Sequence, residues 1–248
     1  MTTPSTFIRR TLLAAFCVTA FLQPALADEA AIRKNIAERL PEFPKIDEIS
    51  KTPIPGLYEL RIGTDLFYTD EQGQHLIVEG QIIETKTRNN LTEQRVSKLT
   101  AIDFAALPLK DAIVWKQGTG ARKLVVFADP NCGYCKKFER DLRGVKDVTV
   151  YTFLIPILGG DSPAKSRDIW CAKDNTKAWR DWMVENTPPA RVMGQCEAGA
   201  IERNMNLAKK HRVTGTPALV FEDGKRVPGA LPAEQVEKLL TASSKKPG

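Results

Sequence analysis

Two cysteines separated by two residues carry the clearest chemistry in this chain. Cys132 and Cys135 bracket Gly133 and Tyr134, directly after an apolar run over residues 124–128 and before a helix-like stretch. This order puts the first thiol at a helix N-terminus, where unpaired N–H groups favour a thiolate. A thiolate attacks disulfides, and a thiol one turn later can close a ring or resolve a mixed disulfide. We therefore predict thiol–disulfide exchange, with Cys132 exposed and Cys135 shielded.

A CxxC motif can also be half of a zinc site or an inert structural bridge. Zinc needs about four ligands, but the sequence has no second CxxC, and its only histidines are His75 and His211. The strand–CxxC–helix context favours redox chemistry over both alternatives. We expect neither a bound metal nor any other cofactor.

The other cysteines suggest a second bridge. The chain has five cysteines, of which Cys17 lies in a predicted signal peptide. With the CxxC as one pair, Cys171 and Cys196 can form the other, and the loop of roughly 25 residues between them would make the bridge worth about 3 kcal/mol. We interpret this pair as structural because neither cysteine sits in a motif. A second redox pair is the alternative.

The N-terminus predicts export. Arg9 and Arg10 precede an apolar stretch over residues 12–22, and small residues follow up to Ala27. This pattern is typical of a secretory signal peptide, here residues 1–27, with cleavage after Ala27. The apolar stretch is short for a membrane span. We therefore expect a soluble protein in an oxidising compartment outside the cytoplasm.

The charge gives no sign of a nucleic-acid site. Loss of the two signal-peptide arginines lowers the formal net charge from +6 to +4, and the remaining charges are of mixed sign. Such a surface is typical of ordinary solvation. We expect no nucleic-acid partner.

Residues 28–88 read as a small N-terminal domain. A helix over 29–40 carries Ile32, Ile36 and Leu40 on one face. The block has no cysteine and is too small to bury much core alone, so we expect it to pair with a second chain through an exposed sheet edge. Its expected strands cover residues 57–62, 66–69 and 76–85.

Residues 89–109 read as a linker helix, because Asn90 with Glu93 three residues later is typical of a helix N-cap. The remainder, 110–248, reads as the catalytic domain. The strand before the CxxC, the helix after it and the strand over 148–154 predict a parallel βαβ unit. Further expected elements are strands over 113–115 and 218–221, a helical region over 160–210 and a final helix over 233–240.

Two stretches carry a family resemblance. FADPNCGYCKKF and TGTPALVF, with a cysteine pair between them, follow a signal peptide and a small N-terminal domain. Together they resemble the DsbC family of periplasmic protein-disulfide isomerases in the thioredoxin superfamily. Related DsbG-type proteins usually carry CPYC, so Gly133 favours the DsbC side. The resemblance implies an α+β fold: a thioredoxin-like catalytic domain with a helical insertion, and a small α+β dimerisation domain joined by the linker helix.

The resemblance also implies partners and site roles. The protein would be a periplasmic homodimer that binds misfolded, disulfide-containing exported proteins and is kept reduced by a DsbD-like membrane protein. Thr216–Pro217 would contain a cis peptide bond and form a shelf for substrate, and Cys171–Cys196 would be the structural disulfide. The CxxC would hold the remaining roles: Cys132 attacks, Cys135 resolves, and Gly133 and Tyr134 tune both thiols.

One position departs from thioredoxin itself. Thioredoxin has a buried aspartate six residues before its first active-site cysteine, where this chain has Val126. Asp129 and Glu139 lie nearby in sequence, and we expect both to be exposed. The residues therefore leave open how Cys135 loses its proton.

Two other functions compete with isomerisation. A disulfide-donating oxidase uses the same CxxC, but oxidases of the DsbA type typically lack the N-terminal domain. A DsbG-like holdase would use the CxxC mainly to reduce single oxidised cysteines. The redox state of Cys132 and Cys135 in the cell is the sharpest discriminator, since an isomerase must arrive reduced.

Overall fold

The structure is a computed structural model that describes residues 24–244. By its internal contacts the chain divides into two compact units, one ending at Gly80 and one beginning at Gln81. Most of the predicted signal peptide, residues 1–27, lies outside the described residues. Within them, no helix combines the length and apolar character needed to cross a membrane.

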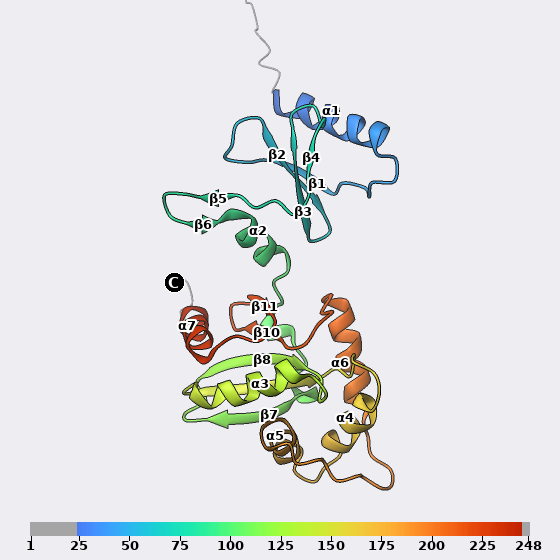
Figure 1. The fold of residues 1–248 in the computed structure, drawn as a ribbon, viewed down its shortest axis with the longest axis vertical. Helices are drawn as coiled ribbons and strands as arrows, with labels where there is room; N and C mark the ends of the chain where they lie inside the picture. The colour runs from blue at the N-terminus through green and yellow to red at the C-terminus, as the bar shows by residue number, and fades with distance from the viewer. Residues whose placement is uncertain (1–23, 245–248) are drawn as a thin grey trace, which may run out of the picture. The chain divides into compact units, whose positions relative to one another are not determined.

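The first unit packs one helix on a four-stranded antiparallel sheet of order β1-β2-β3-β4 (Figure 1). The helix is α1 (Pro24–Arg39), and its Ile32 and Ile36 enter a core that includes Tyr58 and Leu60 from the sheet. The prediction that Ile32 and Ile36 lie on one face of the helix is therefore confirmed. The strands are β1 (Glu48–Lys51), β2 (Leu57–Ile62), β3 (Asp65–Asp70) and β4 (Leu76–Ile77).

Two expectations for this unit are wrong. The helix α1 ends at Arg39, one residue before the expected end, and Leu40 is 44% exposed. The expected strand over 76–85 is split into β4 and a separate two-residue strand, β5 (Ile83–Glu84). Glu79 between them has a φ of 57°, a left-handed backbone conformation that interrupts extended pairing.

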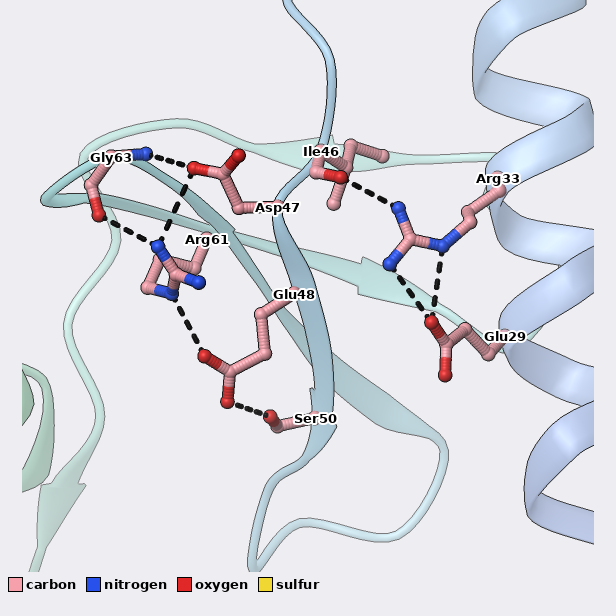
Figure 2. A network of polar contacts seen from close by, with 8 residues as sticks. All are labelled: Glu29, Arg33, Ile46, Asp47, Glu48, Ser50, Arg61 and Gly63. Atoms are coloured by element: carbon pink, nitrogen blue, oxygen red, sulfur yellow. Dashed lines mark hydrogen bonds and ion pairs between the residues drawn. The ribbon is translucent and has the colours of Figure 1, made fainter.

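Two arginines tie the elements of the first unit together (Figure 2). Arg33 on α1 donates to Glu29 on the same helix and, at 2.6 Å, to the backbone carbonyl of Ile46. Arg61 on β2 donates to Glu48 on β1 at 2.8 Å and to the carbonyl of Gly63 at 3.1 Å. Both guanidinium groups thus connect segments that are distant in sequence.

The second unit begins with a short ribbon and a helix. Strand β5 pairs with β6 (Asn89–Asn90), and α2 (Leu91–Leu99) follows. The Asn90 side chain accepts a hydrogen bond from the Glu93 backbone N–H at 3.0 Å, so the predicted N-cap is confirmed. The helix is much shorter than the expected 89–109. Beyond it, residues 102–107 contribute to a hydrophobic core of this unit.

A five-stranded mixed sheet of order β11-β10-β8-β9-β7 forms the centre of the second unit (Figure 1). Strands β8 and β9 are parallel, which confirms the predicted βαβ unit, and α3 (Gly133–Asp141) is the crossover helix. The other neighbours pair antiparallel. The strands are β7 (Ile113–Gln117), β8 (Arg122–Ala128), β9 (Val148–Leu154), β10 (Ala218–Phe221) and β11 (Arg226–Pro228).

Both faces of this sheet are covered. Alternate residues of a strand point to opposite faces: Leu124, Val126 and Ala128 of β8 enter the core that includes α3 and α7 (Ala233–Ser243). Val125 and Phe127 enter the core that includes α6 (Gly199–Lys210). Burial on both faces explains why β8 is an uninterrupted apolar run.

The expected helical region contains α4 (Ser162–Trp170), α5 (Asn175–Glu185) and α6. The Cys171–Cys196 disulfide is formed within it, with 6.0 Å between the Cα atoms. Of three tryptophans in this region, Trp179 is fully buried, whereas Trp170 and Trp182 are only partly buried. Trp182 Nε1 donates to the Pro130 carbonyl at 2.6 Å, so this insertion also contacts the loop that leads to the CxxC.

Candidate active site

Cys132 is the N-cap residue of α3. Its backbone is extended, with φ −76° and ψ 113°, and its sulfur accepts a hydrogen bond from the Cys135 backbone N–H at 3.1 Å. An N-cap acceptor satisfies donors that the first helical turn leaves free. A sulfur is an unusual cap, and the positive end of the helix favours its thiolate form. The predicted position of the first thiol is therefore confirmed.

The two thiols differ strongly in acidity. Hydrogen bonding with the Cys135 side chain is the largest cause that lowers the pKa of Cys132 to about 6, with Thr216 and the N–H groups of Cys135 and Tyr134 adding to it. Burial, together with the nearby Cys132, raises the pKa of Cys135 far above its ordinary value. At neutral pH the first sulfur is therefore a thiolate and the second a thiol.

The expectation that Cys132 is exposed is wrong, because only 4% of its surface is accessible. Its thiol lies 3.3 Å from the Thr216 carbonyl oxygen, and this neighbouring loop covers the sulfur. The exposed part of the motif is Tyr134, at 72%, and Gly133 has open space where a side chain would begin. Cys135 is buried as expected.

The Thr216–Pro217 segment lies beside the CxxC. Its peptide bond is cis, as expected from the resemblance. The Pro217 carbonyl accepts a hydrogen bond from Gly229 N–H at 2.8 Å, which ties the segment to the end of β11. The Thr216 hydroxyl is buried without a well-formed hydrogen bond among the described residues, and it lowers the pKa of both cysteines. Sequence-distant Thr216 is thus in direct contact with the reacting sulfur.

Asp129 and Glu139 are both buried, contrary to expectation. Glu139 is 2% exposed and accepts a hydrogen bond from Trp179 Nε1 at 2.7 Å. Burial raises the pKa of Glu139 to about 7. Asp129 is fully buried and accepts hydrogen bonds from neutral groups of the chain. The position where thioredoxin has its buried aspartate is Val126 of β8, which is buried but has no acidic group.

Two lysines near the CxxC, Lys136 on α3 and Lys165 on α4, contact the same tryptophan. The Lys136 and Lys165 ammonium groups lie 3.5 Å and 4.2 Å from the ring centroid of Trp182. Lys165 also donates to the side chain of Asn131, directly before Cys132, at 2.6 Å. Burial is the main cause that lowers the pKa of Lys136, and Lys165 and Arg140 lower it further. This cluster has no local signal in the sequence, because Trp182 and Lys165 come from the insertion.

The geometry supports one chemistry directly. A stabilised thiolate at Cys132 can attack a disulfide, and the neighbouring Cys135 thiol can later displace the bound partner. The cysteines of the second pair are joined to each other, whereas Cys132 and Cys135 are free.

Family models match both parts of the chain. Residues 23–93 match the N-terminal domain of the disulfide bond isomerase protein, and residues 109–244 match a thioredoxin-like domain. These matches confirm the predicted α+β fold, with a thioredoxin-like domain and a small N-terminal domain.

Whole-chain relatives agree with the domain matches. A probable thiol:disulfide interchange protein DsbC of Bordetella parapertussis is 44% identical over 210 residues, covering 85% of this chain and 73% of that protein. The thiol:disulfide interchange protein DsbC of Escherichia coli is 30% identical over 247 residues, covering 96% of each. A disulfide interchange protein of Neisseria gonorrhoeae has a solved structure that covers 56% of this chain and 100% of its own, with a TM-score of 0.53 and 34% identity.

Proposed function

Because the chain belongs to the DsbC family of thiol:disulfide interchange proteins, we propose that it isomerises incorrect disulfides in exported proteins. One observation carries this proposal: a buried, acidic Cys132 and an isomerase-type N-terminal domain occur in the same polypeptide. An oxidase needs the first feature only. An isomerase also needs a means of holding its client while bonds rearrange.

In the first step the Cys132 thiolate attacks one sulfur of a wrong client disulfide. A Cys132–client disulfide forms, the client S–S bond breaks, and the second client sulfur leaves as a thiolate. That thiolate attacks another client disulfide, and the new free sulfur displaces Cys132. The client has then exchanged one pairing for another with no net gain or loss of electrons.

Cys135 provides the way out when rearrangement stalls. After losing its proton, it attacks the Cys132 sulfur, which releases the reduced client and leaves a Cys132–Cys135 disulfide. Two electrons have then passed to the client, so an external dithiol must restore the reduced enzyme. A DsbD-like membrane protein is our proposed source. Burial raises the pKa of Cys135 and so disfavours this deprotonation, and we expect the exit to be slow enough for the client to rearrange.

The remaining site residues have positioning roles in this proposal. The backbone next to Pro217 binds an extended client segment, and the Thr216 hydroxyl stabilises whichever sulfur carries charge. Gly133 leaves room for the client at the exposed side of the motif, which supports its role in tuning exchange. Tyr134 offers the client an exposed aromatic ring.

We further propose that residues 28–88 dimerise the chain in the periplasm. The first unit has two sheet edges, β1 and the two-residue β4, and exposed Ile77 and Val78 at the latter. Unpaired edges with apolar side chains favour pairing with another chain. The predicted signal peptide supports the location. Chaperone-like binding of clients follows if two arms contact one misfolded chain.

The redox state of the CxxC in the exporting cell tests this function. Trapping thiols in acid and alkylating them should show Cys132 and Cys135 mostly reduced. Mostly oxidised cysteines would instead indicate an oxidase. In vitro, the purified chain should restore activity to a scrambled disulfide protein. Suppression of aggregation without any restored pairing would favour the DsbG-like holdase.

A further inference from the structure

Asp129 is a buried acid beside the CxxC that the thiol chemistry described so far does not use. It directly follows β8 and is fully buried. Burying a carboxylate is costly unless hydrogen bonds replace its water. Among the described residues no cation forms an ion pair with Asp129, so neutral donors must do this.

Three donors from two separate segments of the chain meet at this carboxylate. Oδ1 accepts from the Asn131 backbone N–H and from the Ser162 hydroxyl, both at 2.7 Å. Oδ2 accepts from the Leu158 backbone N–H at 2.9 Å. Asn131 belongs to the loop before the CxxC, whereas Leu158 belongs to the connection from β9 to α4 and Ser162 is the first residue of α4. The carboxylate therefore fastens the CxxC loop to a segment about 30 residues away in sequence.

The main chain of the same residue contacts both cysteines. The Asp129 carbonyl accepts from the Cys132 backbone N–H at 3.0 Å. The Asp129 backbone also interacts with the Cys135 thiol, and this interaction partly offsets the rise in the pKa of that thiol. A shift of Asp129 would therefore be transmitted to both thiols without passing through any other residue.

Thiolate stability at Cys132 depends on this geometry. Hydrogen bonds, and not neighbouring charges, are the causes that lower the pKa of Cys132. Hydrogen bonds weaken steeply when the donor and acceptor move apart or tilt. A loop that drifts would therefore lose thiolate stabilisation even if the fold remained intact.

We infer that Asp129 is a positioning residue: its carboxylate locks the β8–α3 loop to the β9–α4 connection and so holds Cys132 in register with the N-terminus of α3. The inference rests on the proposed function only because thiol exchange at Cys132 is the reaction it serves. It predicts a dependence of Cys132 acidity on a side chain that does not touch the sulfur.

Alkylation of the reduced full-length chain tests the inference. The rate at which iodoacetamide modifies Cys132, followed by mass spectrometry against pH, gives the pKa of that thiol. In Asp129→Asn the amide has one acceptor oxygen in place of two, so a donor loses its partner. We expect the thiolate-to-thiol ratio at a given pH to fall about tenfold. Ser162→Ala removes one of the three donors and should give a smaller fall.

Asp111→Asn is the matched control. Asp111 is also a buried aspartate of the second unit, and it accepts two hydrogen bonds from Arg203, at 2.9 and 2.8 Å. This variant should lose thermal stability and leave the alkylation profile unchanged. If it moves the profile as far as Asp129→Asn does, the effect is general destabilisation and the inference is overturned.

Two other results would also overturn it. An unchanged profile in Asp129→Asn would show that the lock does not set Cys132 acidity. A more acidic Cys132 would show that Asp129 acts only as a buried negative charge. If Asp129→Asn does not fold, Ser162→Ala decides alone, and an unchanged profile there refutes the inference. Alkylation does not require isomerase activity, so these outcomes are independent of the proposed function.

Discussion

At the scale of single residues, the chemistry depends on two thiols of opposite character. Cys132 is stabilised as a thiolate by the start of α3 and by Thr216, while Cys135 is kept protonated by burial. The CxxC spacing and its strand–helix context were sufficient to predict this division. Burial of Cys132 was not predictable, because the covering group, Thr216, is 84 residues away in sequence.

We predict that, of the two CxxC cysteines, only Cys132 reacts with iodoacetamide in the reduced wild-type chain near neutral pH. The rate should rise with pH to a plateau, with a midpoint at about pH 6. Cys135 should stay unmodified throughout, because burial keeps it protonated. Peptide mass spectrometry after timed quenching measures both. A midpoint near the ordinary value of about 8.5 would contradict the thiolate assignment.

Glu139 should make stability depend on pH. Its pKa is about 4.5 when unfolded and about 7 when folded, so the folded state holds the proton more tightly. Stability from this group is therefore lost as pH rises from 4.5 to 7, by about 3 kcal/mol in total. Glu139→Gln cannot ionise, so its stability relative to the wild type should improve from pH 4 to pH 8.

Denaturant unfolding at pH 4, 6 and 8 measures this difference. Glu234→Gln, at an exposed position on α7, is the control and should show a nearly constant difference. A constant difference in Glu139→Gln as well would show that Glu139 ionises normally in the folded chain.

At the scale of elements, the sequence predicted those helices and strands whose bounds depend on local residue patterns. The bounds of β2, β9 and β10 agree with the structure because short apolar or alternating runs are bounded by turn residues. The predicted continuous strand over 76–85 was wrong because Glu79 adopts a positive φ, which is unusual for glutamate and cannot be predicted from the residue type. The predicted exposure of Asp129 and Glu139 was wrong because the residues that hydrogen-bond to them lie far away in sequence. These partners, Ser162 and Trp179, are 33 and 40 residues away.

The Cys171–Cys196 disulfide should stabilise the helical insertion without serving catalysis. Replacing both cysteines with Ala should lower the free energy of unfolding by about 3 kcal/mol, because the bridge joins residues that are 25 positions apart in sequence. Thermal unfolding measures the loss, and alkylation of Cys132 measures whether the active site is preserved. A variant with normal stability but no isomerase activity would mean that this pair is a second redox centre.

At the scale of the whole molecule, the N-terminal unit should separate isomerisation from simple exchange. A chain that begins at Ala101 keeps Ile102, Phe104 and Leu107, which belong to a hydrophobic core of the second unit. A chain that begins at Lys110 would lack these three residues. We predict that this shorter chain is a redox-active monomer, whereas the full chain is a dimer. It should reduce small disulfides normally but rearrange scrambled proteins poorly, because each client meets one arm instead of two.

Sedimentation of both chains and a scrambled-protein assay at equal CxxC concentration test this prediction. If both chains sediment as monomers, or if the shorter chain isomerises scrambled protein at the full rate, the N-terminal unit has another role.

The Cys171–Cys196 bridge is the same kind of bond that Cys132 breaks, so the protein must survive its own reactivity. Arg167 on α4 donates to the carbonyls of Val192 and Gly194, and Trp170 Nε1 donates to the carbonyl of Glu197. If Cys132 of another copy attacks Cys171, a mixed disulfide forms and Cys196 leaves as a thiolate, which these contacts keep at high effective concentration. We expect this thiolate to attack Cys171, displace the other copy and re-form the bridge within the same molecule.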